Sequence, residues 1–179
     1  MPALVPPTAD VRDSFLAAMA EFAAEGRGGP DDNSKRGLDL RERAPGWESV
    51  EGFAAYVRDV LAERVTPSRP GWVTCTSLWY LDGREYLGGL AVRHRLTDHL
   101  REYGGHIGYD VRPSARRRGH ATAMLNEGLV VARGLGIEHA LLTCDWDNVG
   151  SRTIIERAGG VLQDQRGVKL RFWVPTDGT

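Results

Sequence analysis

The residues best suited to chemistry lie in one short stretch, where three consecutive arginines at positions 116–118 precede Gly119. Pro113 cannot donate a ladder hydrogen bond, so a strand that reaches it must end there. Apolar residues recur at helical spacing from Ala121, which places the first turn of a helix beside the arginines. A helix start presents unpaired amide N–H groups and partial positive charge, and glycine permits close approach of an anion. The stretch therefore predicts a diphosphate site.

Two common nucleotide-binding motifs with a glycine-rich turn do not fit this stretch. The sequence has no Gly-Lys-Ser/Thr ending of a P-loop, and no G-x-G-x-x-G with an acidic residue about twenty positions later. A helix start whose arginines are only solvated is a further alternative. It is disfavoured because uncompensated positive charge at a helix start opposes the helix dipole.

The stretch resembles motif A of the GNAT N-acetyltransferases, whose loop reads Arg/Gln-x-x-Gly-x-Gly/Ala. This sequence has Arg-Arg-Arg-Gly-His-Ala at 116–121, preceded by Val-Arg-Pro at 111–113. A second stretch, 147–160, resembles the family segment N-x-x-S/A-…-E-K-x-G-F, although Gly160 stands where Phe is usual. Both motifs occur in the family's order, so the resemblance covers positions 105–160.

The resemblance implies acetyl-coenzyme A as the acetyl donor, no metal, and an amine acceptor on a small molecule or a protein N-terminus. It also implies two splayed strands, 106–111 and 141–148, that open a wedge for the pantetheine arm. The implied coenzyme-binding residues are Tyr109, Val111, Arg112, Arg116, Arg117, Arg118, Gly119, His120, Ala121, Thr122, Asn148 and Ser151. The last two serve equally well as caps of the short helix.

The same resemblance suggests catalytic residues. Many family members carry a tyrosine in the short helix that protonates the departing thiolate; Ile155 takes that position here, so Tyr109 is the expected substitute. In this the chain resembles the branch of ribosomal-protein N-terminal and small-molecule acetyltransferases, where His106 would stand for a common Glu. A histidine begins near neutral pKa, which makes His106 the first candidate base, ahead of Asp145 and Glu102. Each could also be an ordinary strand residue, with His106 satisfied by hydrogen bonds.

Other reactive or aromatic side chains give weaker expectations. Arg93 and His94 follow a strand and could line the acceptor side, although a surface turn explains them equally well. Cys144 has no predictably paired base, so covalent catalysis through it is not expected. Trp79 and Trp146 are expected to contribute packing.

Hydrophobic periodicity predicts the elements that must position these residues. Helices are predicted over 8–26, 48–64, 117–134 and 151–159, and strands over 72–81, 84–92, 104–111, 137–145 and 168–174. Asp82-Gly83 predicts a hairpin turn, and the polar, glycine-rich stretch 26–39 predicts a mobile loop. This order predicts an α/β fold with one mixed, strongly twisted sheet flanked by helices. The helix between strands 104–111 and 137–145 predicts that they run parallel.

Composition bounds the class of protein. The chain has 179 residues, 41% of them hydrophobic, and is expected to form a single acetyltransferase domain over 1–179, with frayed ends near 1–10 and 175–179. A formal net charge of −1 argues against nucleic-acid and membrane partners. Cys75 and Cys144 suggest buried thiols in a reducing cytoplasm. A homodimer is left open, as is a catalytically idle coenzyme-A-binding protein.

Overall fold

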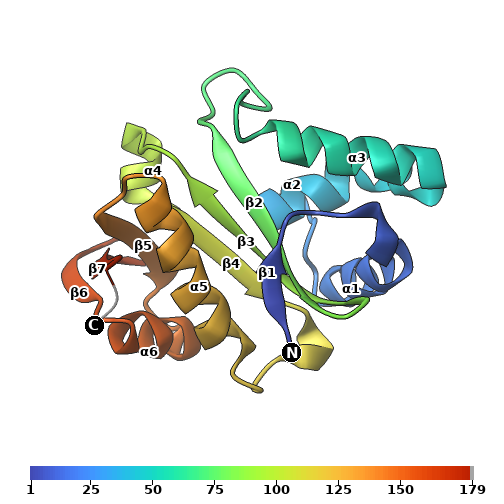
Figure 1. The fold of residues 1–179 in the computed structure, drawn as a ribbon. Coiled ribbons are helices and arrows are strands. Elements are labelled where there is room, and N and C mark those ends of the chain that lie inside the picture. Colours follow the sequence, from blue (N-terminus) through green and yellow to red (C-terminus); the bar gives the residue numbers. More distant parts are fainter. Residues whose placement is uncertain (178–179) are drawn as a thin grey trace.

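Two antiparallel sheets form the centre of the protein, which a computed structural model describes over residues 1–177 (Figure 1). The first sheet has the order β1-β2-β3-β4, and the second has the order β5-β7-β6. The strands are β1 Ala3–Val5, β2 Cys75–Asp82, β3 Glu85–Arg93, β4 Ile107–Val111, β5 His139–Asp145, β6 Val161–Arg166 and β7 Lys169–Pro175. The α/β class and the hairpin between β2 and β3 are confirmed.

Helices cover both faces of the first sheet. In Figure 1, α1, α2 and α3 lie on one side of it, and α5 lies on the other side with α6 beside it. The helices are α1 Arg12–Ala24, α2 Lys35–Glu42, α3 Val50–Ala62, α4 Asp98–Glu102, α5 His120–Gly134 and α6 Val149–Arg157, with 3-10 turns η1 Ala9–Val11, η2 Ala44–Glu48 and η3 Pro113–Ala115.

Each helical layer has its own core. On the α5 side, Leu125, Leu142 and Phe172 are 0–1% exposed and belong to one apolar cluster. On the α1 side, the Phe15 ring stacks on Trp79 with a centroid distance of 4.9 Å, and other aromatic rings surround it. Burial of large aromatic side chains stabilises a fold by about 1.5–3 kcal/mol each. The two cores therefore pack against opposite faces of the first sheet.

The first helix forms where its periodicity predicts it. The apolar residues that define its face are all buried, namely Val11, Phe15, Ala18, Met19 and Phe22. Thr8 caps the preceding turn by accepting a hydrogen bond from the amide of Asp10, and Gly26 ends the helix with a φ of 86°. This part of the prediction is confirmed.

The stretch 26–39 was expected to be a mobile loop, and this expectation is wrong for its second half, where α2 begins. The Ser34 hydroxyl caps α2 by accepting a hydrogen bond from Gly37 at 3.0 Å. Arg36 and Asp39 of this helix are buried. Polar composition predicts solvation, but these charges have buried partners far away in sequence, which local composition cannot reveal.

Two strands were not expected from the sequence. Residues 1–10 were expected to be frayed, yet β1 pairs with β2, and the amide of Leu4 donates to Glu127 of α5 at 2.8 Å. The strand β6 is polar and almost fully exposed, so it lacks the apolar alternation that marks a strand. It forms because it pairs along β7. Residues 175–179 were also expected to be frayed, and this is wrong at their start: Pro175 is the last residue of β7, and the buried Thr176 donates to the carbonyls of Ile137 and Glu138. Residues 178–179 lie outside the described residues.

The expected single mixed sheet is also corrected. Among residues 1–177 every ladder is antiparallel, and none joins β4 to β5. These strands nevertheless lie side by side and run in the same direction, because α5 returns the chain between them (Figure 1). They meet where the amide of His106 donates to the carbonyl of Leu141 at 2.7 Å. The left-handed Gly105, with a φ of 59°, breaks the regular strand geometry just before this contact.

Candidate active site

A segment that we call the cradle, residues 116–122, runs from the end of η3 into the first turn of α5, and its amides from Arg117 onward are unpaired within the described residues. Gly119 caps α5 with a φ of 84°, and Arg117 is the one described non-glycine residue with positive φ, at 61°. Among the described residues, no backbone acceptor faces the amides of 117–122; Ala123 is the first donor of the helix. A Cβ added at Gly119 would meet no atom within 4 Å, so this start is open. Consecutive open amides at a helix start suit phosphate groups.

Two arginines, one just before the cradle and one at its start, hold it to α1. The Nε of Arg112 donates to Glu21 at 2.7 Å. Arg116 makes two parallel hydrogen bonds to Glu25, at 2.7 and 2.8 Å. These bidentate and charge-assisted contacts fix the loop against the helix. Their guanidinium groups are therefore already engaged by carboxylates.

The next two arginines differ. Arg117 and Arg118 are exposed, and within the described part of the chain neither has a hydrogen-bond or ion-pair partner. They can approach an anion held by the cradle. The ring of His120 lies 5.7 Å from that of Tyr80, which gives it a packing contact at the first helical position.

The strand β4 leads into the cradle and has one free edge. Arg112 donates its amide to Leu87 at 2.8 Å, so the even-numbered residues of β4 pair with β3. Tyr109 and Val111 consequently direct their backbone groups the other way, toward β5. Apart from the Val111 carbonyl, which accepts from the Nε of Arg116 at 3.1 Å, these groups have no partner among the described residues.

The opposite edge belongs to β5. Trp146 donates its amide to Val168 at 2.9 Å, so the even-numbered residues of β5 pair with β7. Thr143 and Asp145 therefore turn their backbone groups toward β4. We call the space between these two strand edges the wedge. On the β5 side the Asp145 carbonyl accepts from the amide of Asn148 at 3.0 Å, and the other backbone groups of Thr143 and Asp145 have no partner among the described residues. The open groups on both sides could hydrogen-bond an extended chain lying between them.

A polar pair closes the inner part of the wedge. The hydroxyl of Tyr109 lies 2.9 Å from that of Ser151 on α6, and burial raises the pKa of this tyrosine. Asn148 caps α6 by accepting from the amide of Ser151 at 3.0 Å. The capping role of Asn148 is thus present. Ile155 is 1% exposed in the core, so it packs against the sheet as expected for an aliphatic residue.

His106 lies at the seam where β4 meets β5. It is 8% exposed, and its Nδ1 accepts a hydrogen bond from the amide of Leu141 at 2.9 Å. Burial, and secondarily the charges of Arg101 and Arg93, lower the pKa of His106 to about 4. A neutral imidazole has one acceptor nitrogen, and here that nitrogen is occupied. These contacts favour a structural role for His106 over a role as base.

The carboxylates proposed as weaker bases each have a cationic partner. Asp145 lies 2.7 Å from the Nζ of Lys169, and its side chain is 47% exposed. Glu102 pairs with Arg166 and, more distantly, with Arg171. Of these two, only Asp145 lines the cleft described next.

A cleft of about 970 Å³ connects the α2–α3 side of the molecule with the wedge. Its floor is one face of β2, β3 and β4, on which the odd-numbered residues of β2 and β3 lie beside the even-numbered residues of β4. The described residues of that floor include Cys75, Ser77, Gly89, Ala91, Arg93, Gly108 and Asp110. Trp79 also borders it but packs into the aromatic core, whereas Trp146 is 58% exposed. Cys144 lines the wedge, and burial raises the pKa of its thiol.

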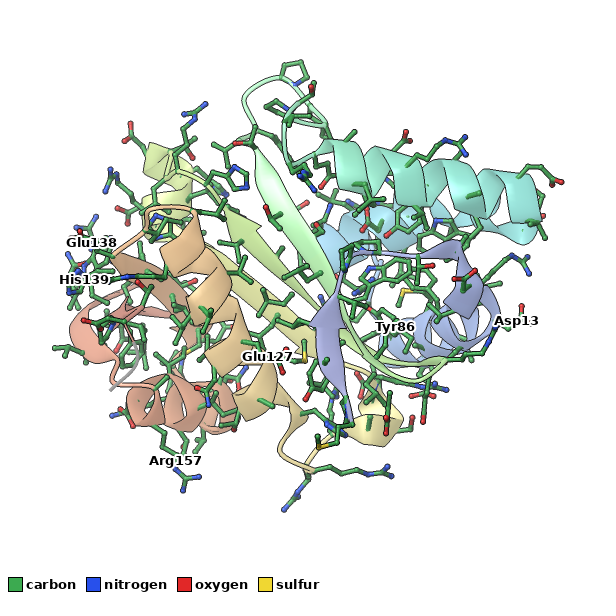
Figure 2. All side chains as sticks on the ribbon, viewed as in Figure 1. Asp13, Tyr86, Glu127, Glu138, His139 and Arg157 are labelled. Atoms are coloured by element: carbon green, nitrogen blue, oxygen red, sulfur yellow. The ribbon has the colours of Figure 1, made fainter. Side chains whose placement is uncertain are left out.

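One network on this floor was missed by the sequence reasoning. Arg36 of α2 makes two hydrogen bonds of 3.0 Å to Asp110 of β4 and one of 2.7 Å to the hydroxyl of Tyr86. Tyr86 lies between α1 and the sheet (Figure 2). Although burial opposes the charge, Asp110 raises the pKa of Arg36 well above its usual value. Gly89 allows this packing, because a Cβ there would lie 3.0 Å from the guanidinium.

Other kinds of site have no support among the described residues. Within residues 1–177, no group of three or more His, Cys, Asp or Glu side chains could hold a metal ion. In the same residues, no helix combines the length and apolar character needed to cross a membrane.

The sequence matches the model of one known protein family. A family model described as an acetyltransferase (GNAT) domain matches residues 34–161. No curated protein matches the sequence significantly. The matched region includes α2, the floor of the cleft, the cradle and α6.

Solved structures resemble the whole described fold. The microcin C7 self-immunity acetyltransferase MccE, in complex with acetyl-CoA and AMP, has a TM-score of 0.65 and 11% identity, over 97% of this chain and 92% of that one. The ribosomal-protein-S5-alanine acetyltransferase of Vibrio fischeri has a TM-score of 0.68 and 9% identity, over 98% and 93%. Mycobacterium smegmatis RimJ, in complex with a CoA-disulfide, has a TM-score of 0.61 and 18% identity, over 97% and 80%. At such identities the likeness concerns the fold.

Proposed function

This chain belongs to the GNAT acetyltransferases, and we propose that it transfers an acetyl group from acetyl-coenzyme A directly to a primary amine. The observation that carries this proposal is the cradle, whose six amides at 117–122 have no backbone acceptor among the described residues. Its position at the end of β4 would set a pyrophosphate beside the wedge. The exposed Arg117 and Arg118 would add charge-assisted hydrogen bonds to that pyrophosphate.

The open strand edges of the wedge suggest how the pantetheine arm of the coenzyme would lie. A pantetheine arm carries two amide groups, and the open backbone edges of Tyr109 and Val111 can pair with them as a neighbouring strand would. Thr143 offers backbone groups from the other side. The arm would then point its thioester along β4 toward the cleft that receives the amine.

The reaction forms one bond and breaks another. The amine nitrogen attacks the thioester carbon, the C–S bond breaks, and the amine loses a proton while the thiolate gains one. Negative charge develops on the carbonyl oxygen during the attack. The unpaired amide of Tyr109 or Val111 would donate a hydrogen bond to it, which is the usual way that proteins stabilise such charge.

Tyr109 is the proposed proton donor to the thiolate. Its hydroxyl faces the wedge and is 2.9 Å from Ser151, which could return a proton to it. Burial raises the pKa of Tyr109, so the phenol is protonated at neutral pH but is a weak acid. We therefore expect Tyr109→Phe to lower turnover by about 10²-fold, the lower end of the general-acid range.

The proton of the amine is proposed to leave through water. His106 cannot accept it without losing the hydrogen bond from Leu141. Asp145 is the remaining candidate that lines the cleft, where it could receive the proton from water. We propose this relay in place of direct transfer to His106.

Thiol release from acetyl-coenzyme A, measured with a broad panel of amines, tests the proposal. Release that depends on the amine, with an acetylated amine as the product, is the expected result. Ile155 at the position of the usual acid motivates the alternative of an idle coenzyme-binding protein. Tight binding of acetyl-coenzyme A without amine-dependent release from any member of the panel would favour that alternative.

A further inference from the structure

Arg93 presents to the cleft a charge that no carboxylate of residues 1–177 neutralises. It is the last residue of β3, and its Nη1 donates to the carbonyls of Gly104 and Gly105 at 3.0 and 3.1 Å. Its Nε and Nη2 have no hydrogen-bond partner among residues 1–177, so most of the guanidinium is unused. Burial lowers the pKa of Arg93, which reflects the cost of keeping this charge away from water.

The other cationic side chains of the cleft are paired. Lysine and arginine line the described cleft at five positions, and four of them form ion pairs with carboxylates. These pairs are Arg27–Asp32 at 2.8 Å, Lys35–Glu63 at 2.9 Å, Arg36–Asp110 at 3.0 Å and Lys169–Asp145 at 2.7 Å. Arg93 is thus the cation of the described cleft that is available to an anionic ligand.

The floor beside Arg93 leaves room for that ligand. Ala91 lies opposite Gly108 in the ladder between β3 and β4, and both are small. A Cβ added at Gly108 would lie 3.5 Å from the Nη2 of Arg93. A larger side chain at Gly108 would therefore crowd the guanidinium. The missing side chain keeps its open donors accessible from the floor of the cleft.

A second polar group faces the same floor. The hydroxyl of Ser77 is buried and has no hydrogen-bond partner among the described residues. Ser77 lies opposite Ala91 in the ladder, on the same face as Arg93. Its polar neighbour is the thiol of Cys75, and a thiol is a weak partner. A buried hydroxyl without a partner costs stability, and a bound ligand atom would remove that cost.

Resting on the acetyl transfer proposed above, we propose that the acceptor is an amine whose skeleton also carries a carboxylate, bound by Arg93 and Ser77. A guanidinium matches a carboxylate with two parallel N–H donors, and the Ser77 hydroxyl would donate a further hydrogen bond. The carboxylate could belong to a free amino acid or to an acidic side chain of a peptide. In either case Arg93 is a specificity-determining residue of the acceptor site.

Matched acceptors test this inference. The acetylation of free amino acids is compared with that of their primary amides, and peptides beginning with Asp are compared with peptides beginning with Asn. Wild type should prefer the carboxylate of one series by about 10- to 100-fold in kcat/KM, the usual size of a charged hydrogen-bond pair. The series that shows the preference identifies the source of the carboxylate. Equal use of acid and amide in both series would overturn the inference while acetyl transfer stands.

Variants of Arg93 test whether this residue causes the preference for acceptors with a carboxylate. Arg93→Gln should remove it mainly through a higher KM, and Arg93→Lys should restore part of it, because lysine keeps the charge but lacks the planar fork. Arg95→Gln is the matched control, since Arg95 is exposed and outside the cleft. If Arg93 only supports the loop at Gly104, Arg93→Gln would slow acid and amide equally. That equal loss would contradict a role in recognition.

Failure of acetyl transfer itself would still leave the subsite measurable. If wild type binds acetyl-coenzyme A but acetylates no amine, the proposed function fails. Binding at the subsite can then be measured directly by titration calorimetry in the presence of coenzyme A, with an N-acetyl amino acid and its amide as the two ligands. Binding of the acid alone, lost in Arg93→Gln, would support the inference. Absent binding, or equal binding of acid and amide, would overturn it.

Discussion

The cradle and the Arg36 network, two regions of one site, are built in opposite ways. The cradle consists of consecutive residues whose open backbone amides are the proposed binding groups, with Gly119 providing the left-handed cap. The Arg36 network joins side chains that are 50 and 74 positions apart in the sequence. Changes in the cradle should therefore affect ligand binding with little effect on stability. Changes in the network should affect stability first, because they break a buried pair that holds α2 to the sheet.

The largest expected effect is on stability, from Arg36→Met. This change leaves Asp110 without its partner, and breaking a buried ion pair costs about 3–5 kcal/mol of unfolding free energy. Chemical denaturation measures this loss. The affinity for coenzyme A should stay within about twofold, because the cradle does not contact Arg36. A combined Arg36→Met and Asp110→Asn variant should recover part of the loss, since no unpaired charge remains. An unchanged midpoint would mean that the network adds no stability.

The next largest effect is on the pH dependence of stability and concerns His106, which lies where β4 of the first sheet meets β5 of the second. Its folded pKa of about 4 lies below the ordinary value of 6.5, so the unfolded chain binds more protons at acidic pH. The stabilisation is complete above pH 6.5 and is lost as the pH falls toward 4, by up to about 3 kcal/mol. His106→Gln should flatten this part of the stability profile, as measured by denaturation at several pH values. A profile that is identical in both proteins would remove His106 as the cause.

A comparable but purely functional effect is expected from Gly119→Glu. The new side chain places a negative charge at the anion site and a Cβ at a φ of 84°, so the affinity for coenzyme A should fall by about 100-fold or more. Gly136→Glu is a matched control, because Gly136 has a φ of 81° and equally open surroundings at the other end of α5. Calorimetric titration should show loss only in the first variant. Equal affinities would mean that the cradle does not bind the pyrophosphate.

The smallest effect is expected at the ion pair that ties the cradle to the end of α1. Glu25→Gln removes the carboxylate that pairs with Arg116, and both side chains are more than 40% exposed. Exposed ion pairs contribute about 0–1 kcal/mol, so the unfolding midpoint should move little. The affinity for coenzyme A should rise or fall by less than about threefold, because the cradle binds chiefly through its backbone. A larger loss of affinity would show that the tether to α1 holds the cradle in its binding conformation.

The parts of the fold that sequence predicted are those that depend on neighbouring residues. The face of α1, the start of α5 at the cradle and the hairpin at Asp82-Gly83 follow from periodicity and from turn chemistry. The polar helix α2 and the exposed strand β6 were missed. Their own residues carry no apolar pattern, and the partners that stabilise them lie elsewhere in the chain.

The candidate site divides in the same way. The cradle could be predicted from local sequence, because unpaired amides and a left-handed glycine are properties of a short run of backbone. The partner of each charge was decided only by the tertiary structure: Arg116 turns to Glu25, Arg36 to Asp110, and Arg93 to no acid in the described residues. An ion pair depends on distance in space, and positions far apart in sequence become neighbours only when the sheets and helices pack. Arginines that look alike in the sequence therefore have different partners, and only packing assigns them.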